Sequence, residues 1–259
     1  MLHWLLAFLI TFGAAYYQRK TGPTYPVEAD AAVGRGIVHV VLHRSHGGAG
    51  DQPVVIEDVG PEVSGRIVWR RFPSSGEFRS IELSRDGDRL EGTLPHQPPA
   101  GKIEYHLELT GGGRTVRVPE RGHVVTRFKG AVPAWALVPH VLFMFAGMLI
   151  SNVAGIAAVR KEVRILGLVR GTVVLLFLGG LLFGPIVQKY AFGEFWTGFP
   201  FGYDLTDNKT LIAFVAWILA LASFRKRKWP RGYVIAAAFV TLVIFLIPHS
   251  LLGSELKVE

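Results

Sequence analysis

The sequence contains no cysteine, which excludes disulfide bonds, thiolate metal sites and thiol nucleophiles. Charged residues are also scarce, at 19% of 259 positions, whereas 50% of the residues are hydrophobic. The mean hydropathy of +0.34 is higher than a water-soluble chain of this length usually shows, so part of the apolar surface must be buried in lipid. We therefore expect a membrane protein whose first partner is the lipid bilayer.

Long apolar runs surround a single polar region. Residues 28–130 contain charges and Gly/Pro turns throughout. Five apolar segments approach the roughly 20 residues that a helix needs to cross a bilayer, and they occupy residues 2–17, 134–159, 165–187, 211–224 and 234–247. The predicted organisation is an N-terminal transmembrane anchor at 1–27, an inserted all-β domain at 28–130 and an all-α four-helix transmembrane bundle at 131–259.

The first apolar segment has two interpretations, a cleaved signal peptide or a retained anchor. No Lys or Arg precedes its apolar core, and the sequence after it is a poor cleavage site. Trp4, Tyr16 and Tyr17 flank the segment as an interfacial aromatic belt would. We therefore favour the anchor.

Basic residues predict the orientation. Arg160, Lys161 and Arg164 follow the second segment, and "FRKRKWPR" at 224–231 follows the fourth. Loops rich in Lys and Arg stay in the cytoplasm, so we expect residues 28–130, the loop 188–210 and the C-terminus to be extracytoplasmic in a bacterial-type inner membrane. Since this topology accounts for the basic residues, the net charge of +8 does not indicate a nucleic-acid partner.

Within the polar region, apolar and polar residues alternate, which is typical of strands with one buried face. Turn sequences such as "HGGAG", "PSSG" and "TGGG" separate these stretches. Seven short strands are predicted, at residues 36–43, 66–72, 78–84, 88–95, 102–109, 114–119 and 123–128. This number of strands in about a hundred residues predicts a β-sandwich.

The stretch "GDRLEGTLPHQPPAGKIEYHLEL" at 87–109 resembles a fibronectin type III or early-set immunoglobulin-like module. A strand that ends in Leu-Pro is followed by a Pro-Gly turn and then by a strand that contains Glu-Tyr. The resemblance implies an immunoglobulin-like fold for the extracytoplasmic domain alone. Such modules bind proteins or sugars or act as spacers, so it implies no reaction chemistry.

The polar region shows no catalytic constellation. Ser45, His46 and Asp51 are close in "HRSHGGAGD", but no strand-turn-helix context surrounds the serine, and a flexible Gly-rich loop is the simpler interpretation. His39 and His43 share a strand face near His46, yet a metal site also needs convergent ligands from elsewhere. We lean towards a protein that is not an enzyme.

Two Pro-His pairs adjoin apolar segments, in "VPH" at 138–140 and "FLIPHSLLG" at 245–253. The predicted topology places His140 and His249 at one depth, near Asp204 and Asp207 of the loop 188–210. One interpretation is that these residues mark helix ends, with Asp207 as an N-cap. The other is a site for a divalent metal such as zinc or copper, or less readily haem b, formed by His140, His249, Asp204 and Asp207.

The same loop is rich in aromatic side chains. Trp196, Phe199, Phe201 and Tyr203 offer large apolar areas, and Trp196 and Tyr203 also have polar tips, so they suit an interfacial belt or a partner-binding surface. Our leading functional prediction is a non-enzymatic accessory or binding protein that docks a membrane or extracytoplasmic protein. The alternative is a metal- or haem-binding redox protein that uses the two histidines.

Glycine pairs predict close helix packing in the third segment. Gly167 and Gly171 form one GxxxG spacing, and Gly180 and Gly184 form another. These spacings suit packing within the bundle or dimerisation of the whole protein. Pro185 is expected to bend or end the helix.

Overall fold

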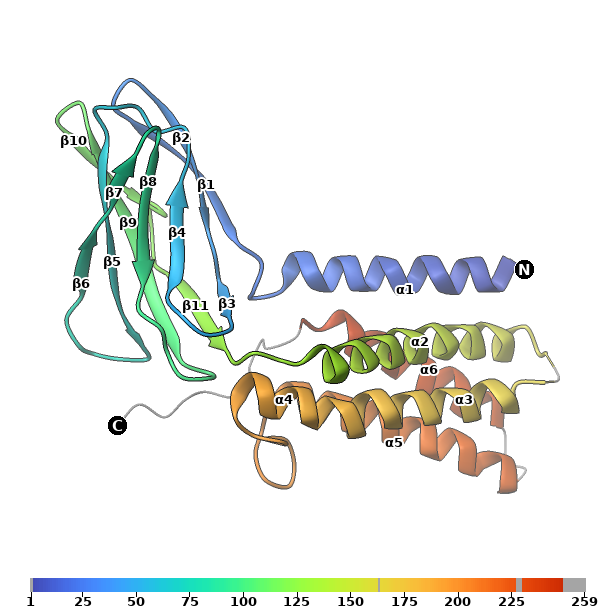
Figure 1. The fold of residues 1–259 in the computed structure, drawn as a ribbon. Coiled ribbons are helices and arrows are strands. Elements are labelled where there is room, and N and C mark those ends of the chain that lie inside the picture. The colour runs from blue at the N-terminus through green and yellow to red at the C-terminus, as the bar shows by residue number, and fades with distance from the viewer. Residues whose placement is uncertain (1, 163, 227–229, 249–259) are drawn as a thin grey trace. The chain divides into compact units, whose positions relative to one another are not determined.

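A helical unit and a β unit make up the protein (Figure 1). The computed structural model describes residues 2–162, 164–226 and 230–248. Of the described residues, the helical unit contains those up to Pro23 and those from Val132 to Pro248, and the β unit runs from Thr24 to Ala131.

The β unit contains three sheets. Antiparallel strands β1 (Val27–Val33) and β2 (Gly36–Leu42) form the first, and the second has the order β4 (Gln52–Ile56), β8 (Arg89–Leu94), β7 (Ser84–Asp86). The largest sheet has the order β3 (Ser45–Gly47), β11 (Val124–Lys129), β9 (Lys102–Gly111), β5 (Ser64–Phe72), β6 (Arg79–Glu82), and β10 (Arg114–Val118) also pairs with β9. Strand β3 pairs with β11 in parallel, whereas β9 pairs with both β11 and β5 in the antiparallel direction.

Strand β9 shows how the sequence pattern builds the core. Ile103, Tyr105, Leu107 and Leu109 alternate along the strand and are buried in one hydrophobic cluster with residues of the other sheets. The Tyr105 hydroxyl donates to the carbonyl oxygen of His43 at 2.8 Å, so this buried phenol has a partner. Burial raises the pKa of Tyr105 above its ordinary value.

Strands occupy all seven predicted stretches, and residues 78–84 contribute to two strands, β6 and β7. The sequence pattern missed β1, β3 and β4. Strand β1 has the sequence "VEADAAV", which is rich in Ala and acidic residues, and β4 is short and contains Pro53, which is disfavoured within a sheet. Pairing with β2 and β8 stabilises them instead.

The helical unit contains α1 (Leu2–Thr21), α2 (Ala134–Val159), α3 (Leu166–Leu176), the π-helical turn η1 (Phe177–Phe183), α4 (Gly184–Phe192), α5 (Leu205–Lys226) and α6 (Pro230–Leu246). Among the described residues, three segments are long and apolar enough to cross a membrane: Ala134–Val159, Leu166–Phe192 and Leu205–Arg225. Helix α6 is apolar but shorter. The expectation of a membrane protein is therefore supported, and the orientation stays a prediction.

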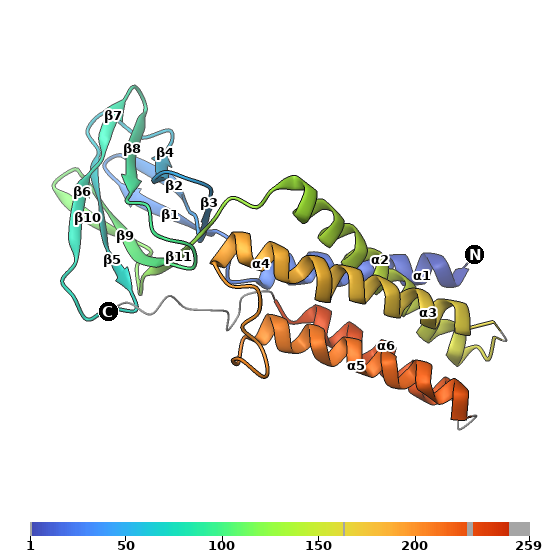
Figure 2. The same cartoon turned by 60° about the horizontal axis from the view of Figure 1, so that its bottom comes forward.

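The first apolar segment forms helix α1, although α1 is not among those three spans. It packs against α2 and α6 within the helical unit (Figures 1 and 2). The buried amide of Asn152 donates to the hydroxyl of Thr11 at 3.0 Å, and the Gln18 amide donates to the carbonyl of Phe245 at 2.9 Å. These bonds hold α1 to the helices that follow the β unit in the sequence.

The third segment is longer than predicted. Helix α3 continues through η1 into α4, so this helical stretch ends at Phe192. The helical stretch does not end at Pro185, which lies in the first turn of α4 directly after the π-helical turn. Helix α5 starts at Leu205, so the loop between the helices covers residues 193–204 rather than 188–210.

Only one of the two GxxxG pairs lies at a close helix contact. A Cβ atom on Gly180 would come within 2.5 Å of Thr210 Cγ2 on α5. On Gly167 it would meet no described atom within 4 Å, and on Gly171 it would be 3.8 Å from Ile150. Gly155 makes a contact that the spacing rule missed, because its Cβ would lie 2.7 Å from the Cβ of Ala238 on α6.

Candidate binding site

The loop 193–204, which we call the aromatic loop, joins α4 to α5 at one end of the helical unit (Figures 1 and 2). Gly193 ends α4 in the left-handed conformation with φ 90°. Beyond it, Phe199, Phe201 and Tyr203 are 68%, 82% and 95% exposed. Trp196 is half-buried, and its indole N–H donates to the carbonyl of Phe199 at 3.0 Å. Three of the four predicted partner-binding side chains are therefore largely exposed.

Asp207 anchors the backbone of this loop. Its buried Oδ2 accepts from the backbone amides of Thr197 at 2.6 Å and Gly198 at 3.0 Å. The same oxygen accepts from the Gln188 amide at 3.1 Å and from the Thr197 hydroxyl at 3.3 Å. Charge-assisted bonds of this kind are among the strong ones, and they connect the aromatic loop to both α4 and α5.

The prediction that Asp207 is the N-cap of this helix is corrected by the structure. Asp204 caps α5, since its Oδ1 accepts from the Thr206 amide at 2.7 Å, and Asp207 lies within the first turn and faces the loop. The neighbouring Asn208 accepts from the Phe199 amide at 2.7 Å. Gly198 fits against this turn because a Cβ there would lie 2.6 Å from the Cβ of Asp207.

His140 is held by the π-helical turn. Its Nδ1 lies 2.9 Å from the carbonyl oxygen of Gly179, which also accepts from the amide of Gly184. A π-helical turn disturbs the regular hydrogen-bond ladder, and here one of its carbonyls has a side-chain partner on α2. A polar ring on an apolar helix is thereby satisfied.

Lys209 is a residue that the sequence interpretation passed over. It is 4% exposed, and its ammonium donates to the carbonyl oxygens of Ile247 at 2.8 Å and Pro248 at 3.4 Å. These carbonyls follow α6, where a cation is favoured by unpaired acceptors and by the helix dipole. The sequence feature that could have indicated a buried, bonded cation is a lysine in the first turns of an apolar helix.

The predicted metal ligands are used in several different ways. Asp207 binds the aromatic loop, Asp204 caps α5 and His140 binds a backbone carbonyl. His249 lies outside the described residues. Within the described part of the chain, no group of three or more His, Asp or Glu side chains is arranged to hold a metal ion. Of this set only Asp204 caps a helix, whereas Asp207 binds the aromatic loop and His140 binds a carbonyl within the helical unit. The metal or haem site that includes His249 stays a prediction.

The candidate triad residues have other partners as well. Asp51 accepts from the backbone amide of His96 at 2.8 Å, and His46 lies 3.2 Å from the carbonyl of Gly50. Ser45 belongs to the short strand β3, which pairs with β11. These residues thus hold loops of the β unit together.

A charged face on the six-stranded sheet was not singled out by the sequence. Glu104 and Glu108 alternate on β9 and form ion pairs with β5: Arg70 to Glu104 at 2.5 Å and Arg66 to Glu108 at 2.6 Å. The bond to Arg66 holds the pKa of Glu108 below its ordinary value and raises the pKa of Arg66. The sequence feature that could have predicted this face is the period-two alternation in "RIVWRR" and "KIEYHLEL", which places the charged side chains of each strand on one face of the sheet.

Two histidines lie within this charged face. His106 on β9 is buried, and its ring lies 5.0 Å from that of His123, which precedes β11. The Phe78 ring stacks on His123 at 4.7 Å, and the Arg70 guanidinium lies 4.4 Å from the Phe78 ring centre. Arg117 donates to the carbonyl of Gly122 at 2.7 Å, and its Nη2 lies 3.2 Å from the His123 ring nitrogens.

The stability of the β unit is expected to fall as the pH drops from about 7 to about 5. Burial lowers the pKa of both His106 and His123, and the charge of Arg117 lowers each further, whereas Glu108 partly opposes this for His106. In the unfolded chain histidine titrates near 6.5, so below that pH the unfolded state binds more protons and is favoured. The measurement is hydrogen exchange of β9 amides in the full-length protein at several pH values.

The double variant His106→Gln/His123→Gln should lose most of this pH dependence. His96→Gln, at an exposed histidine outside the charged face, serves as the matched control and should retain it. An unchanged pH dependence in the double variant would show that these two rings do not cause it.

No family model matches this chain, and no curated protein matches it at a significant level. Functional inference therefore rests on the geometry of the two units.

Proposed function

We propose that this chain is a non-enzymatic accessory protein of the inner membrane that docks a protein partner through its aromatic loop. One observation supports this proposal above the others. Phe199, Phe201 and Tyr203 are exposed to an unusual degree, yet the backbone that presents them is held by the buried side chain of Asp207 and by Asn208. Large aromatic side chains on an ordered backbone are typical of interface hot spots.

The order of the loop favours a protein over the bilayer as its occupant. A lipid interface accepts aromatic rings in many orientations and requires no particular loop conformation. A specific protein interface gains affinity from preorganisation, because less conformational entropy is lost on binding. The hydrogen bonds to Asp207 and Asn208 supply that preorganisation before a partner arrives.

The β unit takes part in the same role in this proposal. We take it to be an immunoglobulin-like sandwich on the extracytoplasmic side, followed by a transmembrane helix bundle. Its charged face, with Arg66, Arg70, Glu104 and Glu108 in cross-strand pairs, has no net charge from these pairs, so in this proposal it contributes polar contacts that fix the register of an interface. The predicted topology puts the aromatic loop and this domain on the same side of the membrane.

Photo-crosslinking in native membranes tests the proposal. A photoreactive phenylalanine analogue at Phe201 or at Tyr203 should yield a crosslink to the same protein from both positions. The analogue at Phe239, an exposed aromatic position on α6, is the matched control and should label lipid. The combined variant Phe199→Ser/Phe201→Ser should reduce recovery of the partner at least about tenfold, since two hot-spot residues together contribute several kcal/mol.

Two results would contradict the proposal. If positions 201 and 203 label only lipid, as position 239 does, the aromatic loop is an interfacial belt. If a crosslinked protein is recovered equally from the Phe199→Ser/Phe201→Ser variant, the aromatic side chains do not form the docking surface.

A further inference from the structure

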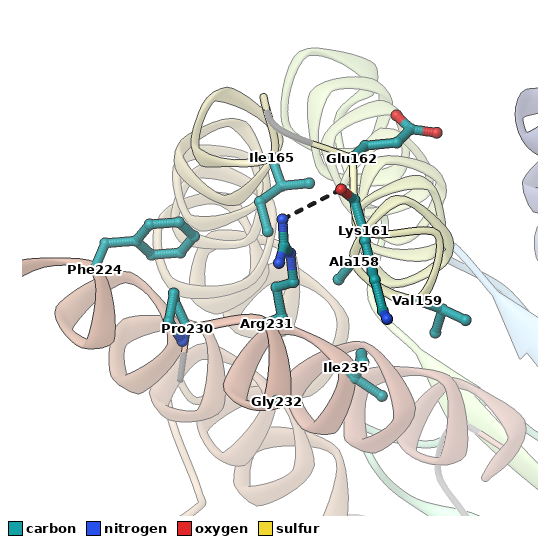
Figure 3. A pocket seen from close by; sticks show the side chains of 10 residues that line it. All are labelled: Ala158, Val159, Lys161, Glu162, Ile165, Phe224, Pro230, Arg231, Gly232 and Ile235. Carbon is teal, nitrogen blue, oxygen red and sulfur yellow. Dashed lines mark hydrogen bonds between the residues drawn. The ribbon is translucent and has the colours of Figure 1, made fainter. Parts of the chain in front are cut away.

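A pocket of about 610 Å³ lies in the helical unit (Figure 3). The helix ends that line it are at the end of this unit opposite the aromatic loop (Figure 1). It lies between the end of α2, the α2–α3 turn, the end of α5 and the start of α6. Its apolar wall includes Phe224, Ile165 and Ile235, and its polar edge includes Lys161, Glu162 and Arg231. The pocket is thus amphipathic and lies where two candidate spans end.

The polar edge has an excess of positive charge. Arg231 reaches over to the α2–α3 turn, where its Nη2 donates to the carbonyl of Lys161 at 3.2 Å (Figure 3). The carboxylate of Glu162 points away from this guanidinium (Figure 3) and already lies 3.5 Å from Arg160 and 3.8 Å from His3. The cations of Lys161 and Arg231 are therefore not neutralised by the acidic residue beside them.

Lys161 has a backbone conformation that is unusual for a residue with a side chain. Lys161 follows α2 in the left-handed region with φ 61°, and its amide bonds to Ala158 while that of Glu162 bonds to Ala157. Glycine is the usual residue at this position of such a helix end, because a Cβ atom is strained there. A lysine at this position places a cation at the pocket edge in spite of that strain.

We infer that this pocket binds the phosphate headgroup of an anionic phospholipid, with Lys161 and Arg231 on the phosphate and the upper acyl chain against Phe224, Ile165 and Ile235. The charge of the polar edge selects an anion, and the apolar wall selects one that has a hydrocarbon chain. Basic pockets between transmembrane helices favour such lipids, which are enriched on the cytoplasmic side. The positive-inside pattern predicts that this end of the unit faces the cytoplasm.

The test is lipid retention by the full-length protein, reconstituted with phosphatidylglycerol and phosphatidylcholine and measured by native mass spectrometry. Wild-type protein should retain phosphatidylglycerol preferentially. Arg231→Gln should weaken that retention about fivefold, the effect of one cation near a lipid surface. Arg225→Gln is the matched control, because Arg225 is exposed near the same end and does not line the pocket in the described part of the chain.

A second variant separates binding from folding. Lys161→Gly removes the cation and also relieves the left-handed backbone, so it should weaken phosphatidylglycerol retention without lowering the melting temperature. Equal retention by the Arg231→Gln and Arg225→Gln variants would overturn the inference, because surface charge alone would then explain binding. Inorganic phosphate that displaces the lipid at equal concentration would also overturn it, since the apolar wall would then contribute nothing.

Discussion

Replacing Asp207 with alanine is expected to disorder the aromatic loop and to lower the free energy of unfolding by about 2–4 kcal/mol, the cost of leaving buried donors unpaired. The substitution removes the acceptor of the Thr197 and Gly198 amides and of the Gln188 side chain. Hydrogen exchange at residues 197 and 198 should become faster. Crosslinking from Phe201 should fall along with it, because the loop would lose its preorganised conformation.

Two control variants limit the interpretation of that result. Asp207→Asn keeps a side-chain oxygen acceptor of the same size and should preserve much of the loop order. Asp204→Ala removes the cap of α5, which should cost only about 1 kcal/mol and act mainly at the helix start. Unchanged exchange at residues 197 and 198 in the Asp207→Ala variant would contradict the assignment of Asp207 as the anchor.

Replacing Gly180 with valine is expected to separate η1 from α5. The free energy of unfolding of the helical unit should fall by about 1–3 kcal/mol, the usual cost of overpacking. A Cβ atom at this position would lie 2.5 Å from Thr210 Cγ2, and a valine adds two further methyl groups. The effect is measured as the thermal unfolding temperature of both proteins in the same detergent, with protease sensitivity as the readout of unfolding.

Gly167→Val is the matched control for this substitution. It makes the same chemical change in a helix of the same apolar segment, but a Cβ atom added at this position would have no described neighbour within 4 Å. Its stability should stay close to that of the wild type. Equal destabilisation by both variants would mean that helix propensity, rather than the contact with α5, sets the cost.

The aromatic loop illustrates which parts of the site were predictable. Phe199, Phe201 and Tyr203 stood out because they cluster in a short stretch of the sequence. The role of Asp207 as the anchor of the loop could not be predicted. An acidic residue near the start of a helix predicts a cap whether or not a loop folds back over it. The choice between Asp204 and Asp207 depends on where α5 begins, and helix ends are the least certain part of such predictions.

The two Pro-His pairs show a different limit. Shared depth predicts one site for His140 and His249, and this stays a prediction because His249 lies outside the described residues. What the sequence did not indicate is that His140 Nδ1 lies beside the Gly179 carbonyl of a π-helical turn. No periodic pattern in the sequence announces a π-helical turn, because it depends on how the helix fits its neighbours. Likewise, the histidine pair of the charged face brings together β9 and the residue that precedes β11, two segments that pair only in the folded sheet.

The sequence by itself determined that a polar β region lies between apolar helical segments, and that several of these segments are long enough to cross a membrane. These properties follow from the length of apolar runs and from period-two alternation, which are local and add up along the chain. Only the tertiary structure decided that Gly180 rather than Gly167 packs against a helix, that Asp207 holds the aromatic loop, and that Lys161 and Arg231 meet at one pocket. Each of these depends on which distant segments face one another, and that is set by packing of the whole unit.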